Sequence, residues 1–136
     1  MPAIFVSMPA TDLERTKAFY VAVGFTLDSQ LTSDTAACAV VEEGHSYLMA
    51  VSRDLFQSFT EKPIGDPRVN PVSAVTVYLD SREAVDAAVL AGVAAGGSED
   101  EPATDYGFMY QRQVCDPDGN ILQFGFMDAS AAPSPA

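Results

Sequence analysis

Residues 11–25 read TDLERTKAFYVAVGF, and this stretch decides the fold. Thr11, followed three residues later by Glu14, forms a capping box that predicts a helix start at Thr11. Apolar residues then recur at helical spacing, and Gly24 is a natural stop because glycine adopts a left-handed conformation cheaply. The apolar runs on either side, residues 3–8 and 25–28, predict strands.

Further strands follow the helix in the first half of the chain. Residues 36–41 and 46–51 are apolar runs separated by Glu42, Glu43 and Gly44, which predicts a hairpin with its turn at these three residues. A short helix is predicted over residues 54–59. Together with the first strand and helix, these elements have the order β-α-β-β-β.

The same order begins again after a segment that contains three prolines. Ser81 is the expected cap of the second helix, and the sequence Asp-Pro-Asp-Gly that starts at Asp116 predicts a turn before the last strand. The first strand after this helix is not apparent in the sequence, because residues 98–105 are acidic and predict a loop. The predicted elements are strands at residues 73–79, 108–114 and 121–126 and a helix at residues 81–95.

The two halves predict an α+β fold in which two paired β-α-β-β-β modules form a curved mixed sheet around a cleft. Neither half can bury its sheet alone, so the cleft between them is where a ligand would bind. We expect one domain over residues 1–128, with modules at about 3–60 and 72–128, a linker at 61–71, and a flexible tail at 129–136.

The charge of the chain excludes some classes of partner. The 136 residues include 7 Lys and Arg against 19 Asp and Glu, a net charge of -12. Such a charge repels nucleic acid and anionic membrane surfaces. No apolar run approaches the roughly 20 residues of a membrane-spanning helix, and the N-terminus does not resemble a signal peptide. We therefore expect a cytoplasmic protein without nucleic-acid or membrane partners.

Few residues offer nucleophilic or acid–base chemistry. Cys38 and Cys115 form no Cys-x-x-Cys pair, and we expect both to be reduced and buried. Cys115 as a nucleophile would need a nearby base, and His45, the single histidine, lies far away in sequence at an expected turn. The sequence contains no phosphate-binding loop, nucleophile elbow or Ser/His/Asp set.

Three segments carry a resemblance to a known family. They are TDLERTKAFYVAVGF at residues 11–25, LDSREAVDAAVLAGVAAGG at 79–97 and DYGFMYQRQVCDPDGNILQF at 105–124. In this order they resemble glyoxalase, bleomycin-resistance and extradiol-dioxygenase proteins of the vicinal-oxygen-chelate superfamily, over residues 3–128. The superfamily hosts isomerases, dioxygenases, transferases and drug-binding proteins, so the resemblance implies a fold rather than a reaction.

The resemblance also implies four metal-ligand slots that face the cleft, which His and Glu usually fill. They fall on Phe5, on Leu48 or Met49, on Ser73 and on Gln123. Phe5 and Leu48 have no donor atom, Met49 and Ser73 are poor or weak ligands for a hard ion, and Gln123 offers one neutral oxygen. We therefore expect no cofactor, and a divalent metal is disfavoured.

Five residues are candidates for binding a ligand in the cleft: Phe5, Ser73, Tyr110, Arg112 and Gln123. The phenol of Tyr110 and the amide of Gln123 can form hydrogen bonds with a ligand held against an apolar wall. Arg112 follows Tyr110 by two residues and would share its face of the strand, where it can anchor a carboxylate. A solvated surface position is the alternative for Arg112.

Three functional hypotheses remain open at this point. The first is a metal-independent protein of the bleomycin-resistance type that sequesters an apolar or aromatic small molecule, with the acidic surface favouring cations. The second is a metal-dependent lyase or dioxygenase similar to lactoylglutathione lyase, and the third is a partner-binding module without a ligand. Whether the protein is an enzyme stays open, and a homodimer is expected from the resemblance alone.

Overall fold

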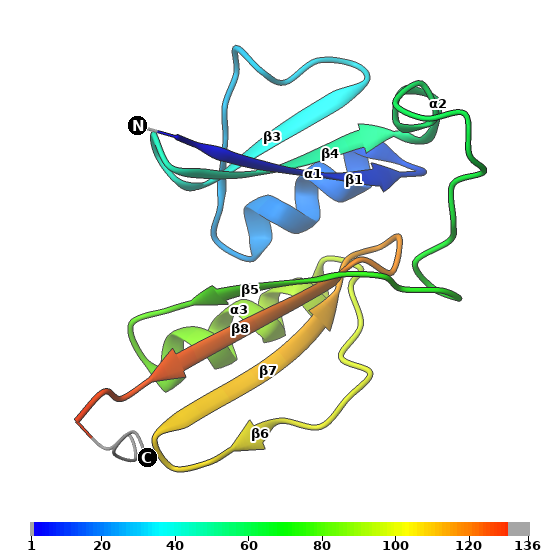
Figure 1. The fold of residues 1–136 in the computed structure, drawn as a ribbon. Helices are drawn as coiled ribbons and strands as arrows, with labels where there is room; N and C mark the ends of the chain where they lie inside the picture. Colours follow the sequence, from blue (N-terminus) through cyan, green and yellow to red (C-terminus); the bar gives the residue numbers. More distant parts are fainter. Residues whose placement is uncertain (1, 131–136) are drawn as a thin grey trace.

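The computed structural model describes residues 2–130, which form two modules that share the order β-α-β-β-β (Figure 1). The first consists of β1 (Ile4–Ala10), α1 (Leu13–Ala22), β2 (Thr26–Leu27), β3 (Ala36–Glu42), β4 (Ser46–Ser52) and α2 (Arg53–Gln57). The second consists of β5 (Ala74–Tyr78), α3 (Arg82–Ala94), β6 (Thr104–Asp105), β7 (Met109–Cys115) and β8 (Ile121–Met127). The predicted α+β class and the module repeat are confirmed. Most of the tail expected at residues 129–136 lies outside the described residues.

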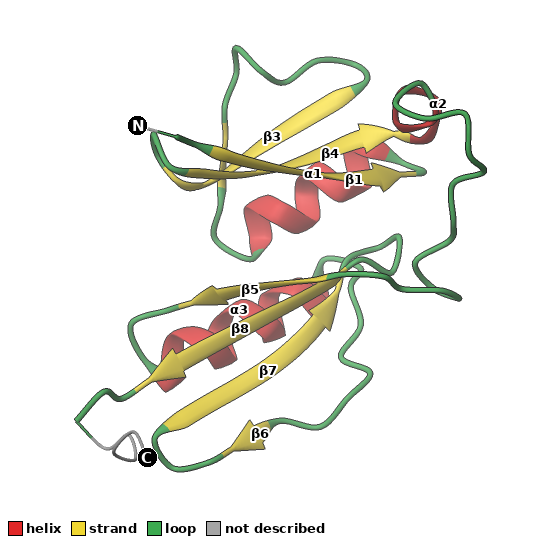
Figure 2. Ribbon diagram, in the orientation of Figure 1, coloured by secondary structure: helices red, strands yellow, loops and turns green. Residues whose placement is uncertain are grey.

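Each module has its own four-stranded mixed sheet. The strand orders are β1-β4-β3-β2 and β5-β8-β7-β6. β1 pairs in parallel with β4, and β5 pairs in parallel with β8, whereas the other neighbours are antiparallel. β1 and β5 are therefore edge strands of separate sheets. The modules lie one above the other in Figure 1, and Figure 2 shows loop along the whole segment between α2 and β5.

The caps of the two long helices show how local sequence sets their starts. Asp12, rather than Thr11, caps α1: its carboxylate accepts a hydrogen bond of 3.2 Å from the backbone N–H of Arg15. The predicted capping box is thus wrong by one residue, because the Thr11 N–H is engaged by Asp118 at 2.9 Å instead. Ser81 caps α3 as predicted, with its hydroxyl oxygen accepting a hydrogen bond of 3.0 Å from the Ala84 N–H.

Two local predictions differ from the structure. The segment expected to be a loop over residues 98–105 contains β6, whose two residues pair with Gln111 and Tyr110 of β7. A strand of two residues is too short to show an alternating pattern in the sequence. It forms because it pairs with β7. Glu42, expected in the hairpin turn, is the last residue of β3 and pairs with Ser46 after a register shift.

The core is continuous between the modules, because α1 and α3 pack against each other. Phe19 of α1 is fully buried against α3, where the small residue Gly92 leaves room for its ring. Phe25 and Phe124 bring the two modules together with ring centroids 6.2 Å apart. Apolar burial of this kind stabilises the pair of modules as one unit.

The turn predicted at residues 116–119 does more than reverse the chain. Asp116 and Asp118 are both buried, and both hydrogen-bond to the other module. Asp118 accepts from the N–H of Thr11 at 2.9 Å and from the hydroxyl of Thr16 at 3.3 Å. Asp116 accepts from the hydroxyl of Tyr20 at 2.9 Å. We call these two carboxylates and their partners the module clasp.

Candidate functional site

The register of β7 and β8 decides which candidate residues share a face of the second sheet. Gln113 lies opposite Gln123, and Arg112 lies opposite Phe124. Side chains alternate between faces along a strand, so Tyr110 and Arg112 lie on the face of the buried Phe124. Gln123 lies on the other face. The second sheet therefore does not bring Tyr110 and Arg112 onto the same face as Gln123.

Tyr110 and Arg112 hold α3 against β7. The hydroxyl of Tyr110 donates to Asp86 of α3 at 2.6 Å, and Arg112 donates to the same carboxylate at 2.8 Å. Arg112 also forms two hydrogen bonds of 2.7 Å with the carboxylate of Glu99. The hydrogen bond from Tyr110, followed by that from Arg112, lowers the pKa of Asp86. Arg112 is thus engaged by two carboxylates of its own chain, instead of facing the cleft.

On the opposite face, Gln123 belongs to a row of polar side chains. Thr76 donates to the amide oxygen of Gln123 at 2.8 Å, and the Gln123 amide nitrogen donates to Gln113 at 3.4 Å. Ser73 precedes β5, and the residue that pairs with Gln123 is Thr76. Phe5 lies on the first sheet, where its ring stacks on Tyr47 with a centroid distance of 4.4 Å.

The residues in the four family metal slots do not fit a divalent ion. Leu48 is buried in the core. Met49, which alternates with it along β4, is therefore the slot residue on the face of the first sheet that is turned away from the core. Phe5 and Met49 offer no hard donor, and Ser73 and Gln123 offer only neutral oxygens. Among residues 2–130, no group of three or more His, Cys, Asp or Glu side chains is arranged to hold a metal ion.

A groove of about 430 Å³ lies between the modules, along the facing edges of β1 and β5. We call it the seam groove. Its walls come from both modules and are mainly apolar, with polar groups among them. The apolar residues include Ile4, Val6, Val41, Val75 and Val77, and the others include Glu42, His45, Ser46, Thr76 and Tyr78.

Glu42 stands out among the groups that line the seam groove. Its side chain is exposed, and it has no hydrogen-bond or ion-pair partner among the described residues. The neighbouring Glu43, in contrast, accepts a hydrogen bond of 3.4 Å from Tyr47 and does not line the groove. Sequence reasoning missed Glu42 because it placed this residue in the turn. The signal that could have identified it is its position at the end of an apolar run, because a longer predicted strand would have included it.

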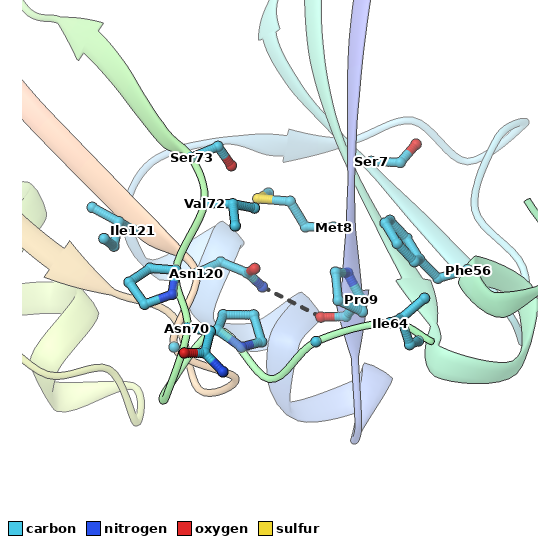
Figure 3. Close-up of a pocket in the computed structure, with 14 residues that line it drawn as sticks. Ser7, Met8, Pro9, Phe56, Ile64, Asn70, Val72, Ser73, Asn120 and Ile121 are labelled. Carbon is cyan, nitrogen blue, oxygen red and sulfur yellow. Dashed lines mark hydrogen bonds between the residues drawn. The ribbon is translucent and has the colours of Figure 1, made fainter. Parts of the chain in front are cut away.

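A second, smaller pocket lies where both modules meet the linker, and it measures about 170 Å³ (Figure 3). We call it the junction pocket. Ser73 lines it, without Phe5 or Gln123. β1, α2, the linker and the turn before β8 all contribute to its walls. The residues include Met8, Phe56, Ile64, Val72 and Ile121 as apolar groups, with Ser7, Ser73 and Asn120 as polar ones.

Comparison with known proteins places this two-module chain in a family. The model of the Glyoxalase/Bleomycin resistance protein/Dioxygenase superfamily matches residues 4–124. The chain belongs to this superfamily. A search of curated proteins gave no match. No helix within residues 2–130 has the length and apolar character required to cross a bilayer.

Solved structures share the fold over most of the chain. A glyoxalase-related enzyme from Fulvimarina pelagi is 20% identical with a TM-score of 0.78, covering 99% of this chain and 93% of that one. Hypothetical protein SA1046 from S. aureus is 22% identical with a TM-score of 0.76, covering 93% and 94%. TnmS3, an antibiotic binding protein from Streptomyces sp. CB03234, is 23% identical with a TM-score of 0.64, covering 93% and 96%. Identities this low show the fold alone.

Proposed function

We propose that this glyoxalase-superfamily protein binds an apolar, aromatic cation in the seam groove and sequesters it without a metal. The observation that carries the proposal is an apolar groove, built from both modules, with an unpaired carboxylate at its rim. Its volume of about 430 Å³ lies within the range of pockets that hold drug-sized ligands. The antibiotic-binding activity named for TnmS3 supports this class of function.

Charge selects the ligand within that class. The Glu42 carboxylate has no partner among the described residues, so it can pair with a ligand cation. Tyr78, with 52% of its surface exposed, offers an aromatic ring at the same groove, and such rings attract cations. The net charge of -12 also draws cations toward the protein and repels anions. A flat aromatic cation can contact the apolar walls of the groove and pair with the carboxylate at its rim at the same time.

Binding of ethidium tests this proposal, with the anionic dye 1-anilinonaphthalene-8-sulfonate as the opposite charge. We expect ethidium to bind and the anion to bind much more weakly. Glu42→Gln should weaken ethidium binding about two- to fivefold, the effect of an exposed ion pair. Glu43→Gln removes the same charge one residue away from the groove and is the matched control. Equal losses in both variants, or tighter binding of the anion, would contradict the proposal.

Blocking the groove is a stronger test than removing its charge. Ser46 lines the groove from the start of β4, and Ser46→Phe would place a ring in the space. We expect ethidium affinity to fall at least about tenfold in this variant, because a ring that fills the groove leaves no apolar wall to bury the dye. Unchanged affinity would show that the dye binds elsewhere.

Metal independence is part of the proposal, and the chemistry of the slot residues supports it. Phe5, Met49, Ser73 and Gln123 do not fit a metal-dependent lyase or dioxygenase site. Metal analysis of protein purified without added ions tests this point directly. We expect no stoichiometric Zn, Ni, Fe or Mn, and a tightly bound equivalent of any of them would contradict metal-independent binding.

The same proposal includes a homodimer. The apolar side chains of Phe5 and Met127 are 48% and 45% exposed on the outer faces of the two sheets, and burial against a second copy would remove them from water. Sedimentation equilibrium measures the state in solution. A dimer that Phe5→Lys disrupts is the expected result, and a monomer at high concentration would contradict it.

A further inference from the structure

The lining of the junction pocket contains no Asp, Glu, Lys, Arg or His. This is notable in a chain with 19 acidic and 7 basic residues, and it separates this pocket from the seam groove with its Glu42 and His45. We propose that the junction pocket is a second binding site, for a neutral single-ring compound that carries an O–H or N–H donor. This site goes beyond the proposed function, because its ligand differs in size and charge.

The volume of the pocket sets the size of the ligand. A cavity of about 150 Å³ lined by apolar side chains is known to hold one benzene ring. The junction pocket measures about 170 Å³ and has Met8, Phe56, Ile64, Val72 and Ile121 in its walls. It therefore accommodates one six-membered ring with a small substituent, whereas a multi-ring cation requires the larger seam groove.

Asn120 sets the polarity of the ligand. Its amide nitrogen donates to the backbone carbonyl of Pro9 at 3.3 Å (Figure 3) and also to the carboxylate of Asp116 at 3.0 Å. Both partners only accept hydrogen bonds, so they fix which end of the amide is nitrogen. The amide oxygen has no partner among the described residues. A ligand O–H or N–H can donate to it, whereas a carboxylate would place one acceptor against another.

Two hydroxyl groups add to this polar edge, one from each side of the junction. Ser7 belongs to β1, and Ser73 lies just before β5 (Figure 3). Neither hydroxyl has a hydrogen-bond partner among residues 2–130. A hydroxyl can donate or accept, so these two groups adapt to a substituent of the ring without selecting a charge. With Asn120, they make a neutral polar edge to an apolar pocket.

A ligand in this pocket would contact both modules and the linker at once. Ser7 and Met8 come from the first module, Ile64 from the linker, and Asn120 and Ile121 from the second. Because such a ligand binds the assembled structure and not the unfolded chain, it stabilises the packing of the modules. We therefore expect occupancy to raise the midpoint of thermal unfolding.

Three probes with one ring each test the chemistry. Phenol has a donor, anisole has the same ring without the donor, and benzoate carries a negative charge. Saturation-transfer NMR with the full chain should show phenol binding about tenfold more tightly than anisole, as expected for one hydrogen bond to a fixed acceptor. Phenol should also shift the side-chain amide signals of Asn120. Benzoate binding as tightly as phenol, or no shift at Asn120, would overturn the proposal.

Variants locate the probe. Ser73→Phe and Ser7→Phe each place a ring in the pocket from an exposed position, so that one remains informative if the other fails to fold. Either should weaken phenol binding at least about tenfold, because the added ring occupies the space. Ser46→Phe, which blocks the seam groove, should leave phenol binding unchanged. If Ser46→Phe removes phenol binding and Ser73→Phe does not, this site is refuted. That result would not contradict the proposal that ethidium binds in the seam groove.

Discussion

Replacing Asp118 tests whether the module clasp holds the two halves together. Its side chain is 3% exposed and accepts hydrogen bonds from Thr11 and Thr16, which lie at sequence separations of 107 and 102 residues. In Asp118→Ala, the Thr16 hydroxyl can still donate to the Asp12 carbonyl at 3.1 Å. Among residues 2–130, the Thr11 N–H has no second acceptor.

The cost of Asp118→Ala follows from these contacts. A hydrogen bond to a charged group contributes about 1.5–3 kcal/mol, and a carboxylate near the start of α1 adds about 0.3–1 kcal/mol through the helix dipole. We therefore expect a loss of about 2–4 kcal/mol in the free energy of unfolding. Asp118→Asn keeps the oxygen that faces Thr11 and loses the charge, so its cost should be nearer to about 1 kcal/mol.

Urea unfolding, followed by far-ultraviolet circular dichroism, measures both variants. Asp34→Ala, at an exposed carboxylate outside the clasp, is the matched control and should change the free energy of unfolding by less than about 0.5 kcal/mol. If Asp118→Ala costs no more than this control, the reasoning that the turn joins the modules is refuted. A change of slope as well as midpoint would indicate that the modules have begun to unfold separately.

Three further predictions concern packing, the charged network and pH. Gly97→Ala should lower the free energy of unfolding by about 1–3 kcal/mol, because its added carbon would lie 2.5 Å from a carbonyl oxygen. The control is Gly65→Ala, whose added carbon meets nothing within 4 Å, and thermal unfolding of both variants checks the difference. Arg112→Met should lower the free energy of unfolding by about 1–3 kcal/mol in urea titrations and leave ethidium affinity unchanged. A large loss of ethidium affinity would show instead that Arg112 belongs to the ligand site. Arg82, by its hydrogen bonds, lowers the pKa of Asp105 to about 2, so the contribution of this carboxylate to stability is complete above its unfolded pKa and is lost as the pH falls toward about 2. The gap in melting temperature between the wild type and Asp105→Asn should therefore be present at about pH 6 and close near about pH 2, and a constant gap would contradict the assigned ion pair.

The elements of the fold could be predicted because their signals are local. Ser81 caps α3 through a neighbouring N–H, and the turn at Asp116 follows from the backbone preferences of proline and glycine. The cap of α1 was displaced from Thr11 to Asp12 because a distant residue, Asp118, takes the Thr11 N–H. A contact at such a separation leaves no trace in the helix sequence.

The candidate site was harder to predict, because it depends on which face of a strand meets the core. Alternation groups Tyr110 with Arg112, but it does not say whether that face meets α3 or the solvent. Pairing of Arg112 with the buried Phe124 settles the question. The only local signal at Glu42 was its position at the end of an apolar run, and its place in the groove depends on the facing edge of β5, a strand of the other module.

The most direct test of the account is where an aromatic cation binds. Nuclear Overhauser effects between bound ethidium and methyl-labelled protein report this location at the level of single side chains. We predict contacts to the methyl groups of Ile4, Val75 and Val77, which bring both modules to one ligand. Contacts confined to Ile64 and Ile121 of the junction pocket, or to no methyl group of the seam groove, would contradict the proposed function.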